Sequence, residues 1–504
     1  MIPFRFHTPC FQHQEEIFEQ TKDRPQFAVF WEMGGGKSKY IIDLASYLYV
    51  NNIIDAVFTI APNGVHANWD MPGEGIQRHL MPELLEISGR LTWYSKRSQH
   101  KATKDAYLRM MRSKFAWFFM AVDAINTKDA YKAAEYFLKR RRVLFVIDEA
   151  QRIKNSKAQC TKKLMKLRNA SQCSWRRILT GTPVDQKPFD IYAPIEWLMP
   201  GYWMEQGIGG DLAFKHTFAD WFKAKMPNGH EMDVQRFDKK TGRLVYKNLE
   251  YLTKMVRPIS SRLLKEDIFD LPEKLYSRAY YELSPAHRKL YDQMEQEFAI
   301  WWEENTVPSE ENPDVRILMS SAELPITRQL RLHQLAMGYV TLDDGEIKEV
   351  SNPNPALELL RELTVDLPHS AIIWCRFRKD VELVEKMLGN SAVSIHGGVP
   401  GEDRTRHVQA FQAGDVPFII GTNAMAEGWT LTRAKTAIYY SNDRRLGKRK
   451  QSEDRAHRPG QNQNLNIIDM LAQNTISELI LDALIHGNEV AMNVMGDKIR
   501  KKWI

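Results

Sequence analysis

The chain has 504 residues, of which 43% are hydrophobic, and this length predicts two or more domains of about 100–200 residues each. It has no apolar run of about 18 residues and no charged start followed by an apolar stretch, which argues against a membrane span and secretion. The net charge is +7, and four widely spaced cysteines without a C-x-x-C pair indicate neither a disulfide framework nor a zinc site, as expected for a reducing cytoplasm.

Short apolar runs alternate with helical segments in the first part of the chain. Residues 38–50 have the apolar spacing of a helix. The runs expected to form strands are 27–33, 55–62, 115–124, 143–150 and 176–184. This alternation predicts an α/β fold in which helices cover both faces of a parallel sheet.

A glycine-rich stretch, WEMGGGKSK at residues 31–39, follows the first predicted strand and opens the helix after it. Backbone N–H groups of such a turn point at phosphates, and this context favours a phosphate-binding loop. Lys37 would then meet the β- and γ-phosphates of a nucleotide, and Ser38 would bind Mg²⁺. Trp31 stands where the general pattern has glycine, so a simple glycine turn after a strand is the alternative.

Adjacent acids end the apolar run VLFVIDEAQ at residues 143–151. Carboxylates at the carboxyl end of a parallel strand lie where ligands bind in open α/β sheets. Asp148 would hold Mg²⁺, and Glu149 would orient or deprotonate the attacking water. Such pairs are often only solvated, but this one follows a glycine-lysine loop by about 110 residues, which favours a nucleotide hydrolase.

Basic residues gather in three places along the chain. The segment between Glu149 and Asp185 has nine lysines and arginines and no acid, and the other clusters are KRRR at 139–142 and DRRLGKRK at 443–450. Such patches are expected for a polyanion partner, and a solvated basic face is the alternative.

The middle and the end of the chain differ in pattern. Residues 201–350 read as mainly helical, with a long helical stretch at 284–304. Strand-like runs then return at 371–377, 392–398, 417–423, 436–442 and 465–471. We therefore expect an α/β lobe at 1–200, helical protrusions and a linker at 201–350, and a second α/β lobe at 351–504.

Several stretches resemble, in order, the motifs of SWI/SNF-like ATPases of helicase superfamily two. DEAQRIKN resembles motif II, and LTGTPVDQKPFDIYAPIEWLMPG at 179–201 resembles motif III and its continuation. GTNAMAEGWTLTRA at 421–434 resembles motif V, and QSEDRAHRPGQ at 451–461 resembles motif VI. The family often lacks the first loop glycine. The resemblance implies two RecA-like lobes that bind ATP and Mg²⁺. Trp31-Glu32 in place of D-E and Gln151 in place of histidine depart from the family pattern.

The resemblance also implies roles for individual residues. Gln14 would read adenine, with Gln12 as the competitor, and Arg455 and Arg458 would reach the γ-phosphate from the second lobe. The expected nucleotide-binding positions are Gln14, Met33, Gly34, Gly35, Gly36, Lys37, Ser38 and Gly428. The expected nucleic-acid contacts are Pro62, Asn63, His396, Gly397, Gly421 and Thr422.

We expect from these motifs an ATP-hydrolysing DNA translocase that acts on duplex, forked or branched DNA with little sequence specificity. The resemblance is to a minimal bacterial or phage type, which would be cytoplasmic in a bacterium or an infected host cell. A strand-separating or branch-migrating helicase is one alternative. An ATP-gated nucleic-acid binding factor with little turnover is the alternative from another class, and the intact Lys37, Glu149 and Arg458 argue against it.

Overall fold

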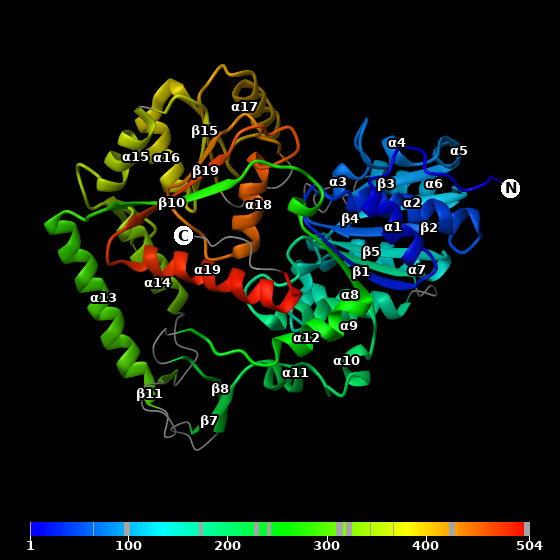
Figure 1. The fold of residues 1–504 in the computed structure, drawn as a ribbon, viewed down its shortest axis with the longest axis horizontal. Coiled ribbons are helices and arrows are strands. Elements are labelled where there is room, and N and C mark those ends of the chain that lie inside the picture. Colours follow the sequence, from blue (N-terminus) through cyan, green and yellow to red (C-terminus); the bar gives the residue numbers. More distant parts are fainter. Residues whose placement is uncertain are drawn as a thin grey trace. The chain divides into compact units, whose positions relative to one another are not determined.

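Two compact units with interleaved segments make up the fold of the chain in the computed structural model (Figure 1). Unit 1 contains the residues up to Phe218, Asn248–Asp270 and a C-terminal piece that begins at Val490. Unit 2 contains Ala219–Lys247 and Leu271–Glu489. The structure describes residues 2–63, 65–94, 101–170, 175–225, 231–238, 243–308, 316–318, 325–342, 344–365, 367–422 and 429–497.

Unit 1 is built on a seven-stranded sheet with the order β3-β4-β2-β5-β6-β1-β9, in which every neighbouring pair is parallel. Its strands are β1 (Gln26–Trp31), β2 (Ala56–Ala61), β3 (Ser88–Trp93), β4 (Phe115–Ala121), β5 (Val143–Asp148), β6 (Arg176–Leu179) and β9 (Ser260–Leu263). All residues of β2, β4 and β5 are buried, as expected for central strands covered on both faces. Each of the predicted runs 27–33, 55–62, 115–124, 143–150 and 176–184 contains a strand, although the strand ends at Ala121 in 115–124 and at Leu179 in 176–184.

Helices follow the strands of unit 1 in the order that a parallel sheet requires. They are α1 (Gln12–Thr21), α2 (Lys37–Val50), α3 (Val65–Asn68), α4 (Gly75–His79), α5 (Pro82–Glu86), α6 (Lys101–Arg112), α7 (Lys128–Arg140), α8 (Gln159–Ala170), α9 (Tyr192–Leu198), α10 (Tyr202–Glu205), α11 (Asp211–Phe218) and α12 (Leu249–Val256). One core cluster packs α2 against β1, β2 and β4, with Trp117 and Phe119 among its fully buried side chains. This packing fixes the start of α2 beside the carboxyl end of β1.

Unit 2 contains a six-stranded sheet with the order β10-β19-β18-β15-β17-β16, again with parallel neighbours throughout. Its strands are β10 (Lys274–Tyr281), β15 (Ala371–Cys375), β16 (Ala392–Ile395), β17 (Phe418–Thr422), β18 (Thr436–Tyr439) and β19 (Leu465–Ala472). The α/β fold with two parallel sheets that the sequence predicts is thereby confirmed.

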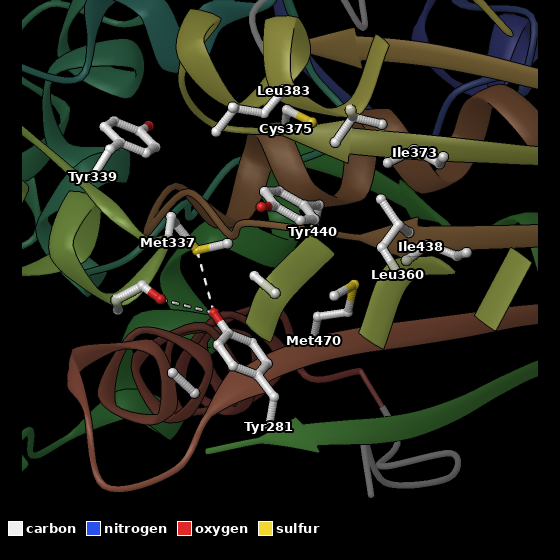
Figure 2. Close-up of a cluster of buried hydrophobic side chains, with 14 of the residues drawn as sticks. Tyr281, Met337, Tyr339, Leu360, Ile373, Cys375, Leu383, Ile438, Tyr440 and Met470 are labelled. Atoms are coloured by element: carbon white, nitrogen blue, oxygen red, sulfur yellow. Dashed lines mark hydrogen bonds between the residues drawn. The ribbon is translucent and has the colours of Figure 1, made fainter. Parts of the chain in front are cut away.

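Both faces of the unit 2 sheet are buried, because successive side chains of a strand point to opposite faces. Ile373 and Cys375 of β15 belong to one core cluster, whereas Ile372 and Trp374 belong to the other. Figure 2 shows the first cluster, where the Tyr281 hydroxyl donates to the carbonyl of Ala336 at 3.0 Å. A tyrosine in a core needs such a partner for its hydroxyl.

The remaining elements of unit 2 are helices and short two-stranded sheets. The helices are α13 (Pro285–Asn305), α14 (Pro325–Ala336), α15 (Pro355–Val365), α16 (Arg378–Leu388), α17 (Gly401–Ala413), α18 (Leu446–Ala456) and α19 (Ile476–Met495), whose last residues belong to unit 1. The two-stranded sheets pair β7 (Trp221–Lys225) with β8 (Glu231–Gln235), β11 (Thr306–Pro308) with β12 (Arg316–Leu318), and β13 (Tyr339–Thr341) with β14 (Ile347–Glu349). Within the described residues, no helix has the length and apolar character of a membrane span.

The range 201–350, which we expected to be mainly helical, also supplies edge strands to both large sheets. β9 pairs with β1 in unit 1, and β10 pairs with β19 in unit 2. The sequence signal for both strands is weak because edge strands are only partly buried and mix polar with apolar residues. The chain between β9 and β10 contains one of the boundaries between the two units, at Leu271.

Candidate active site

The glycine-rich stretch forms a tight turn between β1 and α2 in unit 1. Gly36 is the N-cap of α2 with φ +77°, and Gly34 has φ +91°, conformations that favour glycine. The first N–H groups of α2 lack intrahelical partners and are available to an anion. The Lys37 ammonium donates to the carbonyls of Trp31 at 2.8 Å and Glu32 at 3.2 Å, so it lies over the same turn. This geometry fits the phosphates of a nucleotide.

Trp31, the departure from the general loop pattern, has a structural role. Its side chain is fully buried, and its indole N–H donates to the Ser261 hydroxyl on β9 at 2.9 Å. It also meets His13 and Tyr40 edge to face, with ring centroids 5.2 Å and 5.5 Å apart. The side chain therefore belongs to the core beneath the loop, and the turn is made by the glycines that follow.

Gln14 lies against the loop, whereas Gln12 does not. The Gln14 amide donates to the Gly36 carbonyl at 3.0 Å and accepts from the Phe11 N–H at 2.9 Å. A Cβ on Gly36 would lie only 2.0 Å from the Gln14 amide nitrogen, so this contact requires the glycine. Gln12 is exposed and donates to Glu16 at 2.8 Å. Of the two candidates, the structure brings Gln14 to the glycine-rich turn.

The acid pair ends β5, two strands away from β1 in the sheet order. Asp148 is buried and accepts from the Trp69 indole at 3.2 Å and from the Glu149 N–H at 2.9 Å. Burial raises the pKa of Asp148 and the Glu149 carboxylate adds to that rise, whereas Lys37 opposes it. A buried carboxylate beside a lysine is a suitable ligand for a divalent cation, whose charge would stabilise the ionised form.

Glu149 adopts a left-handed backbone conformation, φ 51° and ψ 54°, that is uncommon for a side chain of this kind. Its carboxylate accepts from the Gln151 amide at 2.6 Å. The side-chain oxygen of Gln151, Oε1, in turn accepts at 2.5 Å from the hydroxyl of Thr180, which directly follows β6. Gln151, which departs from the family pattern, thus joins the acid pair to the turn that follows β6.

The expected nucleotide-binding residues of unit 1 converge on one edge of its sheet, since β5, β6 and β1 are consecutive neighbours. Met33 and Gly35 lie in the turn, and the Gly35 carbonyl contacts the His13 ring at 3.0 Å. Ser38 is in the first turn of α2. Among the described residues, no group of three or more His, Cys, Asp or Glu side chains could hold a metal by itself. Ser38 and Asp148 could therefore complete a Mg²⁺ shell only with phosphate oxygens and water.

Arg455, one of the expected arginine fingers, lies in the last turn of α18 in unit 2, and Arg458, the other, follows the end of that helix. Arg455 is 2% exposed and donates to the Trp429 carbonyl at 3.1 Å. Arg458 is partly exposed, and its guanidinium donates to the Thr430 hydroxyl at 2.8 Å and the Asp454 carbonyl at 2.9 Å. Gly428 lies outside the described residues. The more accessible of the two arginines is Arg458.

A buried charge network holds α18 on the unit 2 sheet. Arg449 is 1% exposed and binds Glu453 at 2.8 Å and Asp469 of β19 at 2.5 Å and 3.0 Å. Its guanidinium also lies 3.4 Å from the Tyr439 ring centroid. Burial would raise the pKa of Glu453, but Lys274 and Arg449 outweigh it and keep that pKa below its usual value. Lys274 binds Glu453 at 2.9 Å from β10.

Replacement of Arg449 by alanine is expected to lower the thermal unfolding midpoint of unit 2 strongly. Removing one partner of a buried ion pair leaves an uncompensated charge and costs about 3–5 kcal/mol. Arg445→Ala is the matched control, because Arg445 comes from the same basic cluster and binds Asp443 with an exposed side chain. Its effect should stay within about 1 kcal/mol. Equal shifts in the two variants, measured by differential scanning calorimetry, would contradict this account.

The expected nucleic-acid residues lie at strand ends in both units. In unit 1, Pro62 and Asn63 follow β2, and the Asn63 amide donates to Asp123 at 3.1 Å. In unit 2, His396 and Gly397 follow β16, and the register pairs Ile395 with Gly421 of β17. The strand ends bearing His396-Gly397 and Gly421-Thr422 are therefore neighbours. Gly421 is buried against the Trp374 ring, where a Cβ would come within 2.9 Å, so this glycine is explained by packing.

Several arginines of the basic clusters stabilise the fold and do not belong to an open basic face. Arg177 is fully buried, and its guanidinium donates to the carbonyls of Thr21, Arg24 and Pro25. Arg141 donates to the carbonyls of Asp55 and Ser113. Arg449 lies in the buried network of unit 2. Fewer residues of the basic clusters are therefore available to a polyanion than the sequence predicts.

Sequence reasoning missed three residues near the loop: Trp69, Arg262 and Asp497. Trp69 donates to Asp148, and Arg262 donates to the carbonyls of Phe30 and Gly181 at 3.0 Å each. Asp497 binds Arg262 at 2.9 Å. None of them stands in a stretch whose sequence indicates a catalytic or binding role. Each is brought to the site from a distant part of the chain.

Comparison with protein families gives two matches that together span most of the chain. The SNF2-related domain matches residues 28–331, and the helicase conserved C-terminal domain matches residues 355–460. The first match contains the phosphate loop and the acid pair, and the second contains Arg455 and Arg458.

Individual relatives are distant and much longer. The TATA-binding protein-associated factor mot1 of Aspergillus fumigatus is 26% identical over 394 residues, which is 70% of this chain and 20% of mot1. An uncharacterized ATP-dependent helicase of Mycoplasma genitalium is 23% identical over 461 residues, covering 89% of this chain and 38% of its own length. The transcription regulatory protein SNF2 of Saccharomyces cerevisiae is 23% identical over 471 residues, covering 90% of this chain and 25% of its own. The chain thus spans about a fifth to two fifths of these relatives.

Among solved structures, the SWI2/SNF2 ATPase core of Sulfolobus solfataricus in complex with double-stranded DNA is 20% identical to this chain. The alignment covers 99% of this chain and 95% of that one, with a TM-score of 0.40.

Proposed function

Because the chain belongs to the SNF2-related family of ATPases in helicase superfamily two, we propose that it couples ATP hydrolysis to movement along DNA. The observation that carries this proposal is the convergence of three elements at one edge of the unit 1 sheet. They are the glycine turn with Lys37, the acid pair Asp148-Glu149, and the Thr180 turn linked to it through Gln151. Each has a distinct task in phosphoryl transfer.

ATP is the substrate that this edge fits. The N–H groups at the start of α2 and the Lys37 ammonium would bind its phosphates. Gln14, which donates to the Gly36 carbonyl beside the loop, would read the adenine. Ser38 and Asp148 would hold Mg²⁺, which neutralises charge on the phosphates when it is bound. Glu149 would accept the proton of the attacking water, since its carboxylate is fixed by Gln151.

Unit 2 would supply a positive charge that stabilises the negative charge of the transition state. An arginine that reaches the γ-phosphate typically contributes about 10³–10⁵ in rate. We assign this role to Arg458 in preference to Arg455, because Arg455 is nearly fully buried in its own unit. If a catalytic arginine comes from the second unit, hydrolysis depends on closure of the two units. Each round of ATP hydrolysis would then be coupled to one round of closing and opening.

DNA is the partner we propose, with contacts at Pro62, Asn63, His396, Gly397, Gly421 and Thr422. The support is their position at strand ends and the family match. Backbone amides and small polar groups bind phosphates without reading the base sequence. We therefore propose little sequence specificity and a preference for duplex, forked or branched DNA. The assignment to a minimal bacterial or phage type remains a prediction.

The deciding measurement is the ATPase rate of the purified chain, alone and with single-stranded, duplex and forked DNA and with RNA. One salt concentration must be used throughout, because phosphate contacts weaken steeply with salt. Stimulation by duplex or forked DNA would support the translocase. Rapid hydrolysis without nucleic acid, or stimulation by RNA alone, would overturn the DNA assignment.

Two further assays separate the alternatives. Displacement of an annealed strand during ATP hydrolysis would favour a strand-separating helicase over a translocase that leaves the duplex intact. Tight DNA binding that responds to ATP, with negligible turnover under all conditions, would favour the ATP-gated binding factor.

A further inference from the structure

The C-terminal end of α19 is fixed on unit 1 by specific contacts. The Thr253 hydroxyl of α12 contacts the carbonyls of Asn493 at 3.1 Å and Val494 at 2.8 Å, which are among the last carbonyls of the helix. Gly496 follows with φ +68°, and the Asp497 N–H donates back to the Met492 carbonyl at 3.0 Å. This left-handed termination places the Asp497 carboxylate at a defined point of unit 1.

Asp497 holds the guanidinium of Arg262 on β9 through two oxygens. Its Oδ1 lies 3.2 Å from Arg262 Nε, and its Oδ2 lies 2.9 Å from Nη2. The Asp497 and Arg262 side chains are 8% and 16% exposed, so solvent screens this pair little. A bidentate carboxylate fixes the plane of the guanidinium as well as its position.

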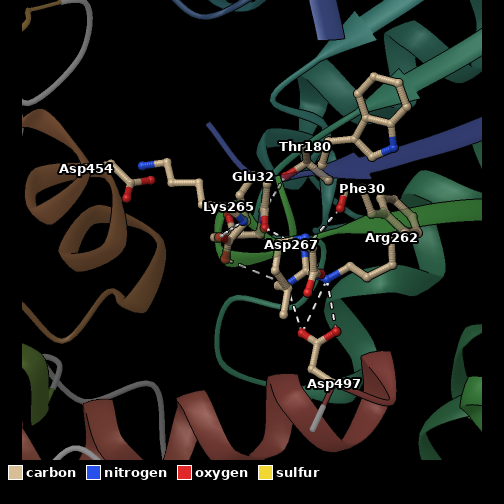
Figure 3. A network of polar contacts seen from close by, with 12 residues as sticks. Phe30, Glu32, Thr180, Arg262, Lys265, Asp267, Asp454 and Asp497 are labelled. Carbon is tan, nitrogen blue, oxygen red and sulfur yellow. Dashed lines mark hydrogen bonds and ion pairs between the residues drawn. The ribbon is translucent and has the colours of Figure 1, made fainter. Parts of the chain in front are cut away.

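The orientation that Asp497 imposes lets Arg262 bind two segments of the active site at once (Figure 3). Its Nη1 donates to the Phe30 carbonyl near the end of β1 and to the Gly181 carbonyl after β6, both at 3.0 Å. These segments are in close contact, since a Cβ on Gly181 would lie 3.2 Å from the Glu32 Cα. Arg262 thus holds the start of the phosphate loop and the turn after β6 at a fixed spacing.

From that turn, hydrogen bonds continue to the acid pair. Thr180 precedes Gly181, and its hydroxyl donates to the side-chain oxygen of Gln151, Oε1, at 2.5 Å. The Gln151 amide donates to the Glu149 carboxylate at 2.6 Å. We name the chain Asp497, Arg262, Gly181-Thr180, Gln151 and Glu149 the C-terminal relay. Every contact in it lies within unit 1.

We propose that Asp497 is a positioning residue for ATP hydrolysis, acting through the C-terminal relay on the orientation of Glu149. This inference rests on the proposed function. Asp497 does not touch the phosphate loop itself, and its effect passes through Arg262. Glu32 is the competing carboxylate, with Oε1 3.9 Å from Arg262 Nη2. Without the charge of Asp497, Arg262 turns toward Glu32, and its hold on Gly181 weakens.

The predicted variant is Asp497→Asn, which keeps the shape of the side chain and removes its charge. We expect kcat to fall about 10-fold, because small misplacement of a positioned group is costly in rate. KM for ATP should change less than about twofold, since the Lys37 ammonium keeps its contacts with the carbonyls of Trp31 and Glu32. The control is Asp482→Asn, which removes the charge from a more exposed aspartate-arginine pair, that of Asp482 with Arg243 in unit 2. The readouts are steady-state ATPase kinetics and the thermal unfolding midpoint of each variant.

A double-mutant cycle with Thr180→Val tests the path itself. If the C-terminal relay carries the effect, the losses of kcat in the two single variants will not multiply in the double variant. Multiplicative losses would overturn the relay even if Asp497→Asn lowers the unfolding midpoint. Equal kcat in Asp497→Asn and Asp482→Asn, in a chain whose wild type hydrolyses ATP, would also overturn it. A wild-type chain without ATPase activity would instead refute the proposed function.

Discussion

Lys37→Ala is expected to reduce ATP hydrolysis by at least about 10²–10³-fold, the range seen when one positioned donor to developing charge is lost. The ammonium lies over the glycine turn, held by the carbonyls of Trp31 and Glu32 at 2.8 Å and 3.2 Å. Lys37 is the first residue of α2, and residues 32–36 of the turn before it contain no lysine or arginine. The measurement is the rate of phosphate release at saturating ATP and DNA.

Lys37 also holds the turn together, so the folded state of the variant must be checked. Lys128→Ala is the control, because Lys128 is an exposed lysine at the start of α7 in the same unit. We expect Lys128→Ala to keep the basal rate without DNA. Phosphate release by Lys37→Ala at a rate comparable to Lys128→Ala would reject the glycine turn as the phosphate site.

Glu149→Gln is expected to stop turnover and to leave ATP binding nearly unchanged. A general base typically contributes about 10²–10⁴ in rate, and the amide cannot accept the proton. The substitution is close to isosteric, and the amide oxygen can still accept the hydrogen bond that Gln151 now donates at 2.6 Å. The left-handed backbone at this position is also retained by glutamine, so the local fold should persist.

Two assays separate chemistry from binding for this variant. ATP affinity is measured by equilibrium titration, and hydrolysis is measured in a single turnover with enzyme in excess. Glu135→Gln is the control, because Glu135 is a partly exposed residue of α7 that binds Lys139 at 3.0 Å. Normal single-turnover hydrolysis by Glu149→Gln would refute Glu149 as the catalytic base, and a loss of ATP affinity would assign it a role in binding.

Apolar runs were sufficient to predict the two parallel sheets, and the residues predicted from motifs for a nucleotide site in unit 1 lie at one edge of its sheet. The runs are buried on both faces and therefore carry a strong signal, as β4 with seven buried residues illustrates. The strands β3, β9 and β10 lie toward the edges of the sheets and mix polar with apolar residues, and they were not predicted.

Charge in the sequence was a weaker guide than hydrophobicity. The clusters that contain Arg141, Arg177 and Arg449 looked like parts of a polyanion surface. In the structure Arg177 and Arg449 are buried, and Arg141 binds backbone carbonyls. A guanidinium has five donors and can bind several carbonyls or carboxylates at once. An arginine can therefore hold buried segments together as well as bind an anion at the surface. Composition alone does not distinguish these two uses.

The sequence by itself determined the fold class, the glycine turn with Lys37 and the acid pair Asp148-Glu149, because these depend on residues close together in the chain. Only the tertiary structure decided that Gln14 and not Gln12 meets the loop, that Trp31 belongs to the core, and that Arg262 and Asp497 join the site. The physical reason is separation along the chain. Asp497 and Arg262 are 235 positions apart, and packing alone brings such residues within hydrogen-bonding distance.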